Sequence, residues 1–447
     1  MPVGLAVAAP SNTTGAKCPS LYHRLPKSKN RHYDNGSYFL AVARILYCGD
    51  VGAQTGFGRV AEELIPRLCD DHEIHALAVN WYGDPSPMQE YCKMYPASAG
   101  GPDPFGSHRI AEIAAAIKPD LVWITNDLWC MPPLLQALKP VRESVPMKVY
   151  GYAPIDSYGI FPEFMASLDG LDGLGTYTQF GREELLKAGY GKEVDVIPHG
   201  VDRTKFFPMD REECRQGLGI APDDFVVFNG NRNQPRKRID ITIKGFIRFA
   251  VNSPRARLWL HMGIKDQGWD IIPLFNRVAR DYGYDPTNRL ILTNANFSVN
   301  NCLSIESLNR AYNAADIGVN TCIAEGWGLV NFEHAATGVA QLVPDHTSLK
   351  EIFSDVPRIG CLESETDRGY GLERPVPSSE SLAERLDYYY QSPEALQATG
   401  KWCYEKACNP AYEWPTIVGQ MKGIIDRTLS APAPSKFKGF GTPVRLG

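Results

Sequence analysis

The most constraining feature of this sequence is a regular alternation of short apolar runs and amphipathic segments, which occurs twice. The first series begins at residues 43–48 and closes at 194–198, and the second begins at 225–230. Apolar runs of this length are typical of strands, and the segments between them have helical periodicity. Strands that alternate with helices form a parallel, helix-covered sheet. The sequence therefore predicts an α/β protein with two Rossmann-like halves.

Composition narrows the class of protein. The net charge of −5 gives no global electrostatic signature for nucleic acid or an anionic membrane. No run of eighteen apolar residues occurs, so we expect no transmembrane segment, and the N-terminus lacks the basic region of a signal peptide. Eleven cysteines, an odd number without paired metal spacing, fit buried thiols in a reducing compartment. We therefore predict a cytoplasmic protein without a metal centre.

One stretch of the second half has the pattern of an anion site. An apolar run at 316–323 leads through a Gly-rich turn into a helix that we expect to begin near Val330 and to end at Gly338. The N–H groups of Gly328, Leu329 and Val330 would have no intrahelical acceptor, and the helix dipole adds positive potential there. Phosphate is a suitable ligand for such a helix terminus.

Two carboxylates flank this turn. Glu325 precedes the helix and Glu333 lies about one turn inside it, so both can accept hydrogen bonds from hydroxyl groups. Each has a simpler interpretation, since Glu325 can cap a helix and Glu333 can be a solvated helix residue. The Gly-rich turn between them, within a strand and helix alternation, favours a nucleotide-sugar site over those alternatives.

The same residues resemble a known family. Glu325 and Glu333 are separated by seven residues, and this spacing is similar to the signature of glycosyltransferase family 4. The tract at 312–338, YNAADIGVNTCIAEGWGLVNFEHAATG, resembles that family throughout. One departure is Ala324, where many relatives have Gly. The resemblance implies a retaining enzyme with the GT-B fold, two Rossmann-like domains facing across a cleft. It implies that Glu325 holds donor sugar hydroxyls and Glu333 ribose hydroxyls, with a nucleotide sugar as co-substrate, no other cofactor and no metal.

A Gly-rich loop also follows the first strand. The segment TGFGR at 55–59 resembles the family loop that lines the cleft, and Gly56 and Gly58 would let the backbone approach a phosphate or a sugar. We expect the helix after this loop to span 60–68. The GxGxxG spacing of a dinucleotide-binding fingerprint is not met. A Rossmann oxidoreductase would also leave the second half unexplained.

A basic loop follows the first strand of the second half. Four cations lie within residues 232–238, directly after a predicted strand end. A solvated basic loop is the simpler interpretation, but strand ends in such sheets point toward ligands. The resemblance implies that Arg232 and Lys237 bind the donor diphosphate, with Asn231 as an alternative register for the arginine. These two cations and the helix amides would then stabilise the leaving diphosphate.

The acceptor side is predicted from strand ends of the first half. Asp156 follows such an end, and we assign it to the catalytic set as the acceptor-side polar residue, although a turn role fits equally well. Many relatives carry a His near these strand ends, where this chain has Thr125 or Asn126. The resemblance then implies that the departing phosphate takes the acceptor proton, without a side-chain base.

The resemblance also sets the domain organisation. We expect an irregular N-terminal arm at 1–40, an acceptor domain at 41–205 and a nucleotide-sugar domain at 206–410. A C-terminal helix at 411–430 is expected to return to the acceptor domain, as GT-B chains commonly do. Residues 431–447 are rich in Pro and Gly and are expected to be a mobile tail.

The segment at 196–208 resembles the family's connection between the two domains. It contains His199, which we interpret as a turn histidine with satisfied hydrogen bonds, in preference to a functional group.

Two acceptors and one non-catalytic function are the open interpretations. A saccharide or lipid-linked glycan is the default, and a modified base in DNA is the alternative, because the tails and the 232–238 loop are basic. The acidic net charge weighs against DNA. A non-catalytic nucleotide-sugar-binding protein with a GT-B fold is the third interpretation, against which Glu325, Glu333 and Lys237 argue.

Overall fold

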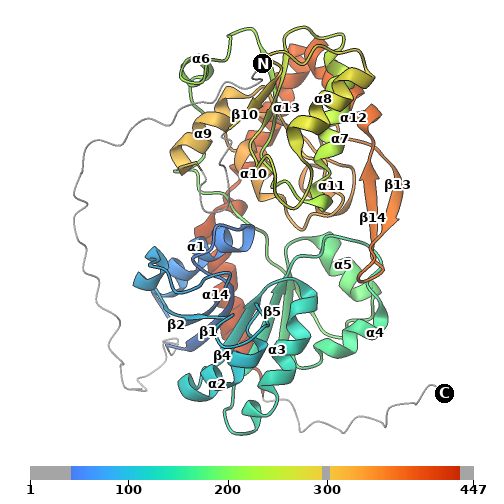
Figure 1. Ribbon diagram of the computed structural model, residues 1–447. Helices are drawn as coiled ribbons and strands as arrows, with labels where there is room; N and C mark the ends of the chain where they lie inside the picture. Colours follow the sequence, from blue (N-terminus) through green and yellow to red (C-terminus); the bar gives the residue numbers. More distant parts are fainter. Residues whose placement is uncertain (1–41, 294–302, 433–447) are drawn as a thin grey trace, which may run out of the picture.

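The computed structural model describes residues 42–293 and 303–432 and contains two parallel sheets, one in each half of the chain (Figure 1). The first sheet has the order β3-β2-β1-β4-β5-β6-β7 and the second the order β10-β9-β8-β11-β12. The predicted α/β fold with two Rossmann-like halves is confirmed. The strands of the first sheet are β1 Arg44–Asp50, β2 Glu73–Val79, β3 Lys93–Pro96, β4 Leu121–Thr125, β5 Lys148–Ala153, β6 Gly173–Thr176 and β7 Val194–Val196. Those of the second are β8 Phe225–Asn229, β9 Ala256–Leu260, β10 Leu290–Leu292, β11 Ile317–Val319 and β12 Ala340–Leu342.

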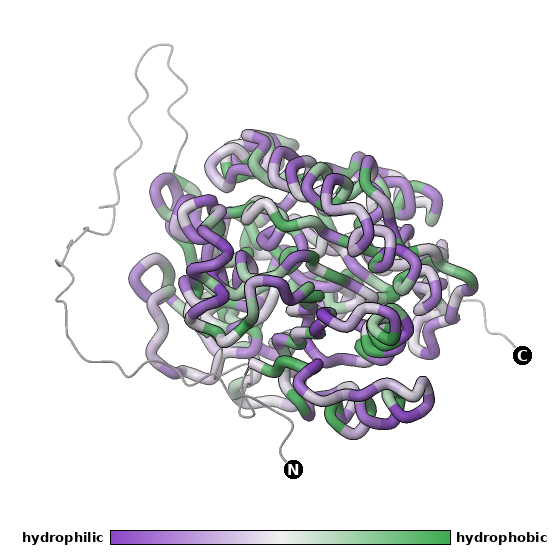
Figure 2. Tube along the Cα trace, turned by 90° about the horizontal axis from the view of Figure 1, so that it is seen from above, coloured by the Kyte–Doolittle hydropathy of each residue, from purple (hydrophilic) through white to green (hydrophobic). Residues whose placement is uncertain are grey.

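Helical turns on the outside of the molecule change between hydrophilic and hydrophobic residues (Figure 2). An amphipathic helix buries its apolar stripe and exposes its polar face. The helices are α1 Gly56–Leu68, α2 Ser107–Ile117, α3 Met131–Leu138, α4 Pro162–Met165, α5 Gln179–Lys187, α6 Arg211–Gln216, α7 Ile239–Ala250, α8 Ile271–Asp281, α9 Ile305–Ala314, α10 Leu329–Ala335, α11 Thr347–Ile352, α12 Ser379–Gln391, α13 Pro393–Ala407 and α14 Trp414–Ser430. Among the described helices, none combines the length and the apolar character that a bilayer crossing requires.

Helix α1 begins earlier than its sequence predicts. It starts at Gly56, four residues before the expected position, because the Thr55 hydroxyl accepts the N–H of Gly58 at 3.0 Å and caps the helix. A Cβ at Gly58 would lie 1.9 Å from the carbonyl oxygen of Ala53. Gly58 is therefore required by close packing under the first turn. That it also lets the backbone approach a ligand stays a prediction.

The last helix returns to the first sheet. Helix α14 packs against α1 and lies beside the first half of the molecule (Figure 1). Lys422 pairs with Asp71 at 2.6 Å, and Arg427 pairs with Asp195 at 2.6 Å. The chain therefore crosses between the halves a second time, so that two covalent connections limit how the halves can move relative to each other.

A hairpin outside both sheets was not predicted. Strands β13 Cys361–Thr366 and β14 Glu373–Pro377 pair in antiparallel fashion and extend toward the first half (Figure 1). Tyr158 of the first half exchanges two backbone hydrogen bonds of 3.0 Å with Glu373. The sequence of β13 is acidic and without the alternating apolar pattern of a half-buried strand, which is why it was missed.

Direct polar contacts also join the halves around the cleft. The carboxylate of Glu351 accepts the N–H groups of Gln179 at 3.0 Å and Phe180 at 2.7 Å, and so caps helix α5 from the opposite half. The Tyr158 hydroxyl accepts the N–H of Thr347 at 3.2 Å. Thr347 has a φ of 47°, which is rare for a β-branched residue, so this loop conformation is held by its surroundings.

Candidate functional site

A cavity of about 1450 Å³ separates the two halves. Its walls come from the strand ends of the first sheet, the strand ends of the second sheet and the turn of the β13–β14 hairpin. Ligands of doubly wound sheets lie in this position. The lining includes nine of the residues predicted from sequence, namely Gly56, Asp156, Arg232, Lys237, Glu325, Gly328, Leu329, Val330 and Glu333. Gly58, the tenth, is not among the described lining residues.

Glu325 and Lys237 form an ion pair at the centre of this cavity. The Lys237 ammonium donates to Glu325 Oε2 in close contact, and the Arg236 guanidinium lies 3.9 Å from Oε1. Burial raises the pKa of the Glu325 carboxyl. The charges of Lys237 and Arg236, together with hydrogen bonds from Lys237 and Asn320, outweigh burial and hold that pKa below its ordinary value. Glu325 is therefore ionised and can accept hydrogen bonds from a ligand.

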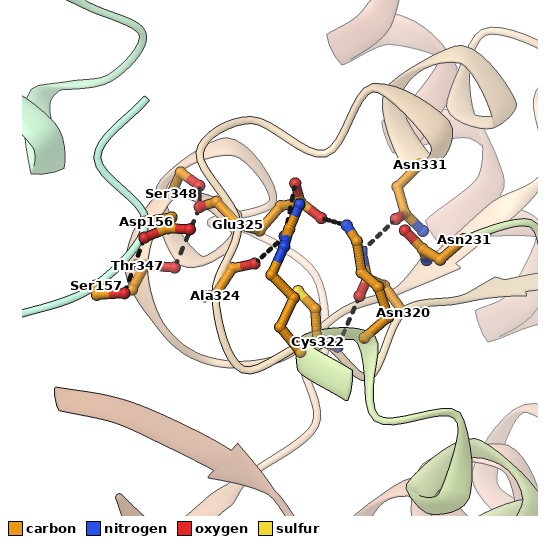
Figure 3. A network of polar contacts seen from close by, with 12 residues as sticks. Asp156, Ser157, Asn231, Asn320, Cys322, Ala324, Glu325, Asn331, Thr347 and Ser348 are labelled. Atoms are coloured by element: carbon orange, nitrogen blue, oxygen red, sulfur yellow. Dashed lines mark hydrogen bonds and ion pairs between the residues drawn. The ribbon is translucent and has the colours of Figure 1, made fainter. Parts of the chain in front are cut away.

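A network of amide side chains fixes the loop that carries Glu325 (Figure 3). Asn320, after strand β11, donates to Asn331 Oδ1 at 2.8 Å and accepts the N–H of Cys322 at 2.8 Å. The Ser348 hydroxyl donates to the Glu325 carbonyl oxygen. Gly328, with φ of 89°, makes the turn into the helix, and a Cβ there would lie 2.7 Å from Leu349. The loop is therefore rigid before any ligand binds.

The basic loop is anchored to the same strand end. The Thr321 hydroxyl lies 3.1 Å from the carbonyl oxygen of Lys237, and Arg236 donates to the Ala324 carbonyl at 2.6 Å. Arg232 is elsewhere on the cavity rim, where its guanidinium pairs with Asp266 at 2.6 and 3.1 Å. Asn231, the alternative register, is buried and donates to Asn229 Oδ1 at 3.1 Å. Arg236 is thus the cation nearest to the Lys237–Glu325 pair, although it was not among the residues predicted from the sequence.

Glu333 contacts a residue of the opposite half. Arg59 of helix α1 donates to Glu333 Oε1 at 2.9 Å, and its guanidinium lies 5.7 Å from the centre of the Phe206 ring. Burial raises the pKa of the Glu333 carboxyl, and the Arg59 charge opposes this shift in part. This ion pair of the cavity spans the two halves.

The first turn of α10 forms part of the cavity wall that comes from the second half. The helix begins at Leu329, one residue before the expected position, and Gly328 is its N-cap residue. N–H groups at the first turn have no intrahelical acceptor. Leu329 also faces Gly56, since a Cβ on that glycine would lie 3.9 Å from the Leu329 side chain. The first turns of α1 and α10 therefore meet across the cavity.

The wall formed by the first half contains four carboxylates, two of which, Asp156 and Asp127, lie close to each other. Asp156 accepts the Ser157 hydroxyl at 2.8 Å and lies beside the Glu325 loop (Figure 3). Asp127 also lines the cavity, whereas Thr125 and Asn126, at the position of the relatives' His, are buried behind it. Burial, and then the charge of Asp156, raise the pKa of Asp127 to about 6.

The raised pKa of Asp127 predicts a stabilising substitution. The folded pKa of about 6 exceeds the ordinary value of 3.8, so the folded state binds the proton more tightly and this carboxyl costs stability once the pH rises through 6. Asp127→Asn is expected to raise the free energy of unfolding at pH 7.5 by about 1 to 2 kcal/mol, with no gain at pH 4. Thermal unfolding at the two pH values measures this difference. The exposed Asp169→Asn should show none, and an equal Asp127→Asn effect at both pH values would contradict the assignment.

His199 differs from its prediction. It is buried against Tyr177, at 4.0 Å between ring centres, and near Trp327 at 5.7 Å. Neither of its ring nitrogens has a hydrogen-bond partner among the described residues, and burial lowers its pKa to about 3. The interpretation as a satisfied turn histidine is wrong, because aromatic rings from both halves surround a neutral imidazole.

Three residues of the site were missed. Arg59, Arg236 and Asp127 all line the cavity next to a predicted residue. Arg236 could have been predicted from its position in the basic loop, and Asp127 from its position after β4. Arg59 directly follows the Gly-rich segment, but nothing local indicated its partner. The described residues contain no group of three or more His, Cys, Asp or Glu side chains placed to hold a metal ion.

Comparison with known proteins gives distant relatives. No family model matches the chain. A D-inositol 3-phosphate glycosyltransferase of Geodermatophilus obscurus is 30% identical over 147 residues, which are 32% of this chain and 31% of the relative. D-inositol 3-phosphate glycosyltransferase 2 of Catenulispora acidiphila is 27% identical over 316 residues, which are 69% of this chain and 68% of the relative. The chain spans about a third to a half of the other first relatives that it matches.

Solved structures agree in fold. The sucrose-phosphate synthase of Thermosynechococcus elongatus superposes with a TM-score of 0.68 at 15% identity, over 87% of this chain and 100% of that structure. Anabaena HepE in complex with UDP and glucose gives 0.63 at 14% identity, over 86% of this chain and all of that structure. The predicted resemblance to glycosyltransferase family 4 is therefore confirmed, and the chain is a distant homologue of the D-inositol 3-phosphate glycosyltransferases with a GT-B fold.

Proposed function

We propose that the chain is a retaining glycosyltransferase that moves a hexose from a UDP- or GDP-sugar to a hydroxyl group of a glycan or glycolipid. The observation that carries this proposal is the buried Lys237–Glu325 pair beside the first turn of α10, in a cavity that also holds Glu333. Such a site combines cations and amides for a diphosphate with carboxylates for hydroxyl groups. The UDP and glucose in the complex of Anabaena HepE, a protein of the same fold, support a UDP-sugar as donor.

Each wall of the cavity has a role in donor binding. Lys237 and the first-turn amides of α10 receive the diphosphate, with Arg236 or Arg232 as the second cation. Glu333 accepts the ribose hydroxyls through its carboxylate, which retains one oxygen not used by Arg59. Glu325 accepts hydroxyls of the donor hexose. This division assigns the nucleotide to the second half and leaves the carboxylates of the first half for the acceptor.

The reaction breaks the bond between the anomeric carbon and the diphosphate oxygen, and an acceptor oxygen forms the new bond on the same face. Negative charge grows on the departing phosphate, where Lys237 and the helix amides stabilise it. The departing phosphate takes the proton of the acceptor hydroxyl. Asp156 and Asp127 orient that hydroxyl from the opposite wall. Water must be excluded during this step, and contacts between the halves around the cavity serve this purpose.

Two other functions are less well supported. A non-catalytic nucleotide-sugar-binding protein has no need of a buried Lys237–Glu325 pair, whose desolvation is costly. Transfer to a modified DNA base remains an alternative acceptor reaction for the same donor site. The relatives are named for D-inositol 3-phosphate, a polyhydroxylated ring, which favours a hydroxyl acceptor outside nucleic acid.

The described cysteines are free thiols, in keeping with the predicted cytoplasmic location.

Thermal shift measurements with UDP-, GDP- and ADP-sugars and with NAD(H) test the proposal. One nucleotide-sugar class is expected to raise Tm, with a stabilisation of about 2.7 kcal/mol at a hundredfold excess over Kd. Glu333→Ala should weaken that binding by at least about tenfold, since it removes hydrogen bonds to a charged acceptor. The base of the stabilising nucleotide then identifies the donor.

A matched variant is Glu384→Ala, which removes an exposed helical glutamate distant from the cavity and should respond to the donor as the unsubstituted protein does. Stabilisation by NAD(H) alone, or by no nucleotide sugar, would contradict the proposed function.

A further inference from the structure

The hairpin turn between β13 and β14 completes one end of the cavity. Asp367, Tyr370 and Arg374 from this hairpin line the cavity, although the hairpin belongs to neither sheet. Besides the backbone pairing at Tyr158, Arg374 donates to the Ser157 hydroxyl at 3.2 Å. The hairpin is therefore joined to the acceptor wall, next to Asp156, and forms a boundary of whatever binds there.

Exposed aromatic rings gather at this end. Trp129 is 39% exposed, Phe161 53% and Tyr370 44%, and all three line the cavity. The rings of Trp129 and Tyr370 lie 6.1 Å apart with 24° between their planes, one from each half. Phe105 holds Trp129 from behind, edge to face at 5.1 Å. Large aromatic side chains left exposed in one cavity mark a binding surface.

Carboxylates lie beside these rings. Asp127, which is two residues before Trp129, is close enough to Asp156 for their charges to interact. Asp50 and Glu62, also from the first half, line other parts of the cavity. Such groups accept hydrogen bonds from hydroxyls. An apolar ring face next to hydroxyl acceptors matches a pyranose, whose C–H faces pack on aromatic rings and whose hydroxyls lie around the ring edge.

The charge around this end disfavours a nucleic acid. Residues 361–377 contain four acidic and two basic side chains. The Arg374 guanidinium of the hairpin is already paired with Asp367 at 3.1 Å. Binding of a phosphate backbone requires an excess of free Lys and Arg. The same rings with this acidic surround fit an uncharged saccharide.

We propose that the Trp129–Tyr370 ring pair and the carboxylates of Asp127 and Asp156 form the acceptor subsite, and that it binds a pyranose ring of a saccharide. This inference rests on the proposed transferase function and specifies its acceptor. The hairpin supplies one of the two rings, so the subsite exists only while the halves are in contact through the hairpin.

Saturation-transfer difference NMR of the full chain with bound UDP tests the subsite directly. The probes are methyl α-D-glucopyranoside, methyl α-D-mannopyranoside and maltose. At least one should bind saturably, with the strongest transfer to ring C–H protons. Trp129→Ala and Tyr370→Ala should each weaken its affinity roughly fivefold to tenfold. Tyr82→Ala, which removes a tyrosine that is 72% exposed and outside the cavity, should leave that affinity unchanged.

Three outcomes would overturn the subsite. The first is a protein that binds UDP but none of the three saccharides, and the second is equal affinity in the ring variants and Tyr82→Ala. The third is displacement of the saccharide by a single-stranded oligothymidylate, which would assign the surface to nucleic acid. Stabilisation by UDP is scored separately in each variant. Failure of UDP to bind the unsubstituted chain would contradict the donor site, whereas failure of the saccharides alone contradicts only the subsite.

Discussion

Lys237→Ala is expected to reduce kcat for hexose transfer by about a hundredfold to a thousandfold. The ammonium lies inside the cavity on the Glu325 carboxylate, and a desolvated charge stabilises a departing diphosphate far more than an exposed charge does. Lys244, a half-buried lysine that pairs with Asp240, provides the matched control, because it lies on the same half and outside the cavity. Lys244→Ala should retain kcat. Initial rates with the donor identified by thermal shift measure both variants.

A structural explanation of the loss must be separated from a catalytic one. Removal of Lys237 leaves the Glu325 carboxylate buried with one counter-charge fewer, at a cost of about 3 to 5 kcal/mol in stability for a broken buried pair. The double variant Lys237→Ala with Glu325→Gln removes that charge and should recover much of the Tm. Its kcat should stay low. Recovery of kcat together with Tm would show that Lys237 serves only to neutralise Glu325.

The fold was predictable because buried parallel strands leave a clear signal. Strands such as β4 and β8 are buried along their whole length and appear in the sequence as continuous apolar runs. Strand β3 was missed since it lies at the sheet edge, is not fully buried and begins with a lysine. Hairpin β13–β14 was missed for a related reason, as five of the six residues of β13 are exposed.

The site was predictable where its residues are local in sequence. Glu325, Gly328 and Glu333 occupy one strand, turn and helix, and Lys237 follows a neighbouring strand, so sheet geometry alone brings them together. The start of α1 was placed too late because Gly56 and Gly58 are poor helix formers. The first turn of α1 is held by the Thr55 cap and by close packing of Gly58. Helix propensities of single residues do not predict either contact.

Contacts between the halves could not be predicted, because they produce no local pattern in the sequence. Arg59 and Glu333 are 274 positions apart, and each has a plausible role without the other. The same holds for Glu351, whose carboxylate caps α5 from the opposite half, and for Tyr370, which meets Trp129. These residues read as ordinary surface side chains in the sequence. They are the ones that set how closely the two halves approach around a ligand.

Arg59→Ala is expected to weaken UDP binding roughly tenfold to a hundredfold at pH 7, and the loss should diminish as the pH rises. Arg59 donates to Glu333 at 2.9 Å and opposes the effect of burial, which already raises the pKa of that carboxyl. Without the guanidinium the pKa of Glu333 rises further, so more of the carboxyl is protonated at pH 7 and accepts ribose hydrogen bonds poorly. Raising the pH through the new pKa restores the carboxylate and hence the affinity.

Isothermal titration of UDP between pH 6 and 9 measures this dependence, and a second arginine of the same helix controls for it. Arg67 also pairs with a glutamate, Glu63, at 2.8 Å, but it is outside the cavity. Arg67→Ala should bind UDP as the unsubstituted protein does, and Arg59→Lys should retain most of the affinity because it keeps the charge. A loss in Arg59→Ala that is constant with pH would mean that the arginine acts by holding the two halves together. A loss that disappears at high pH means that the first half of the chain controls the ionisation of the ribose-binding carboxylate in the second, so that donor binding depends on contact between the halves.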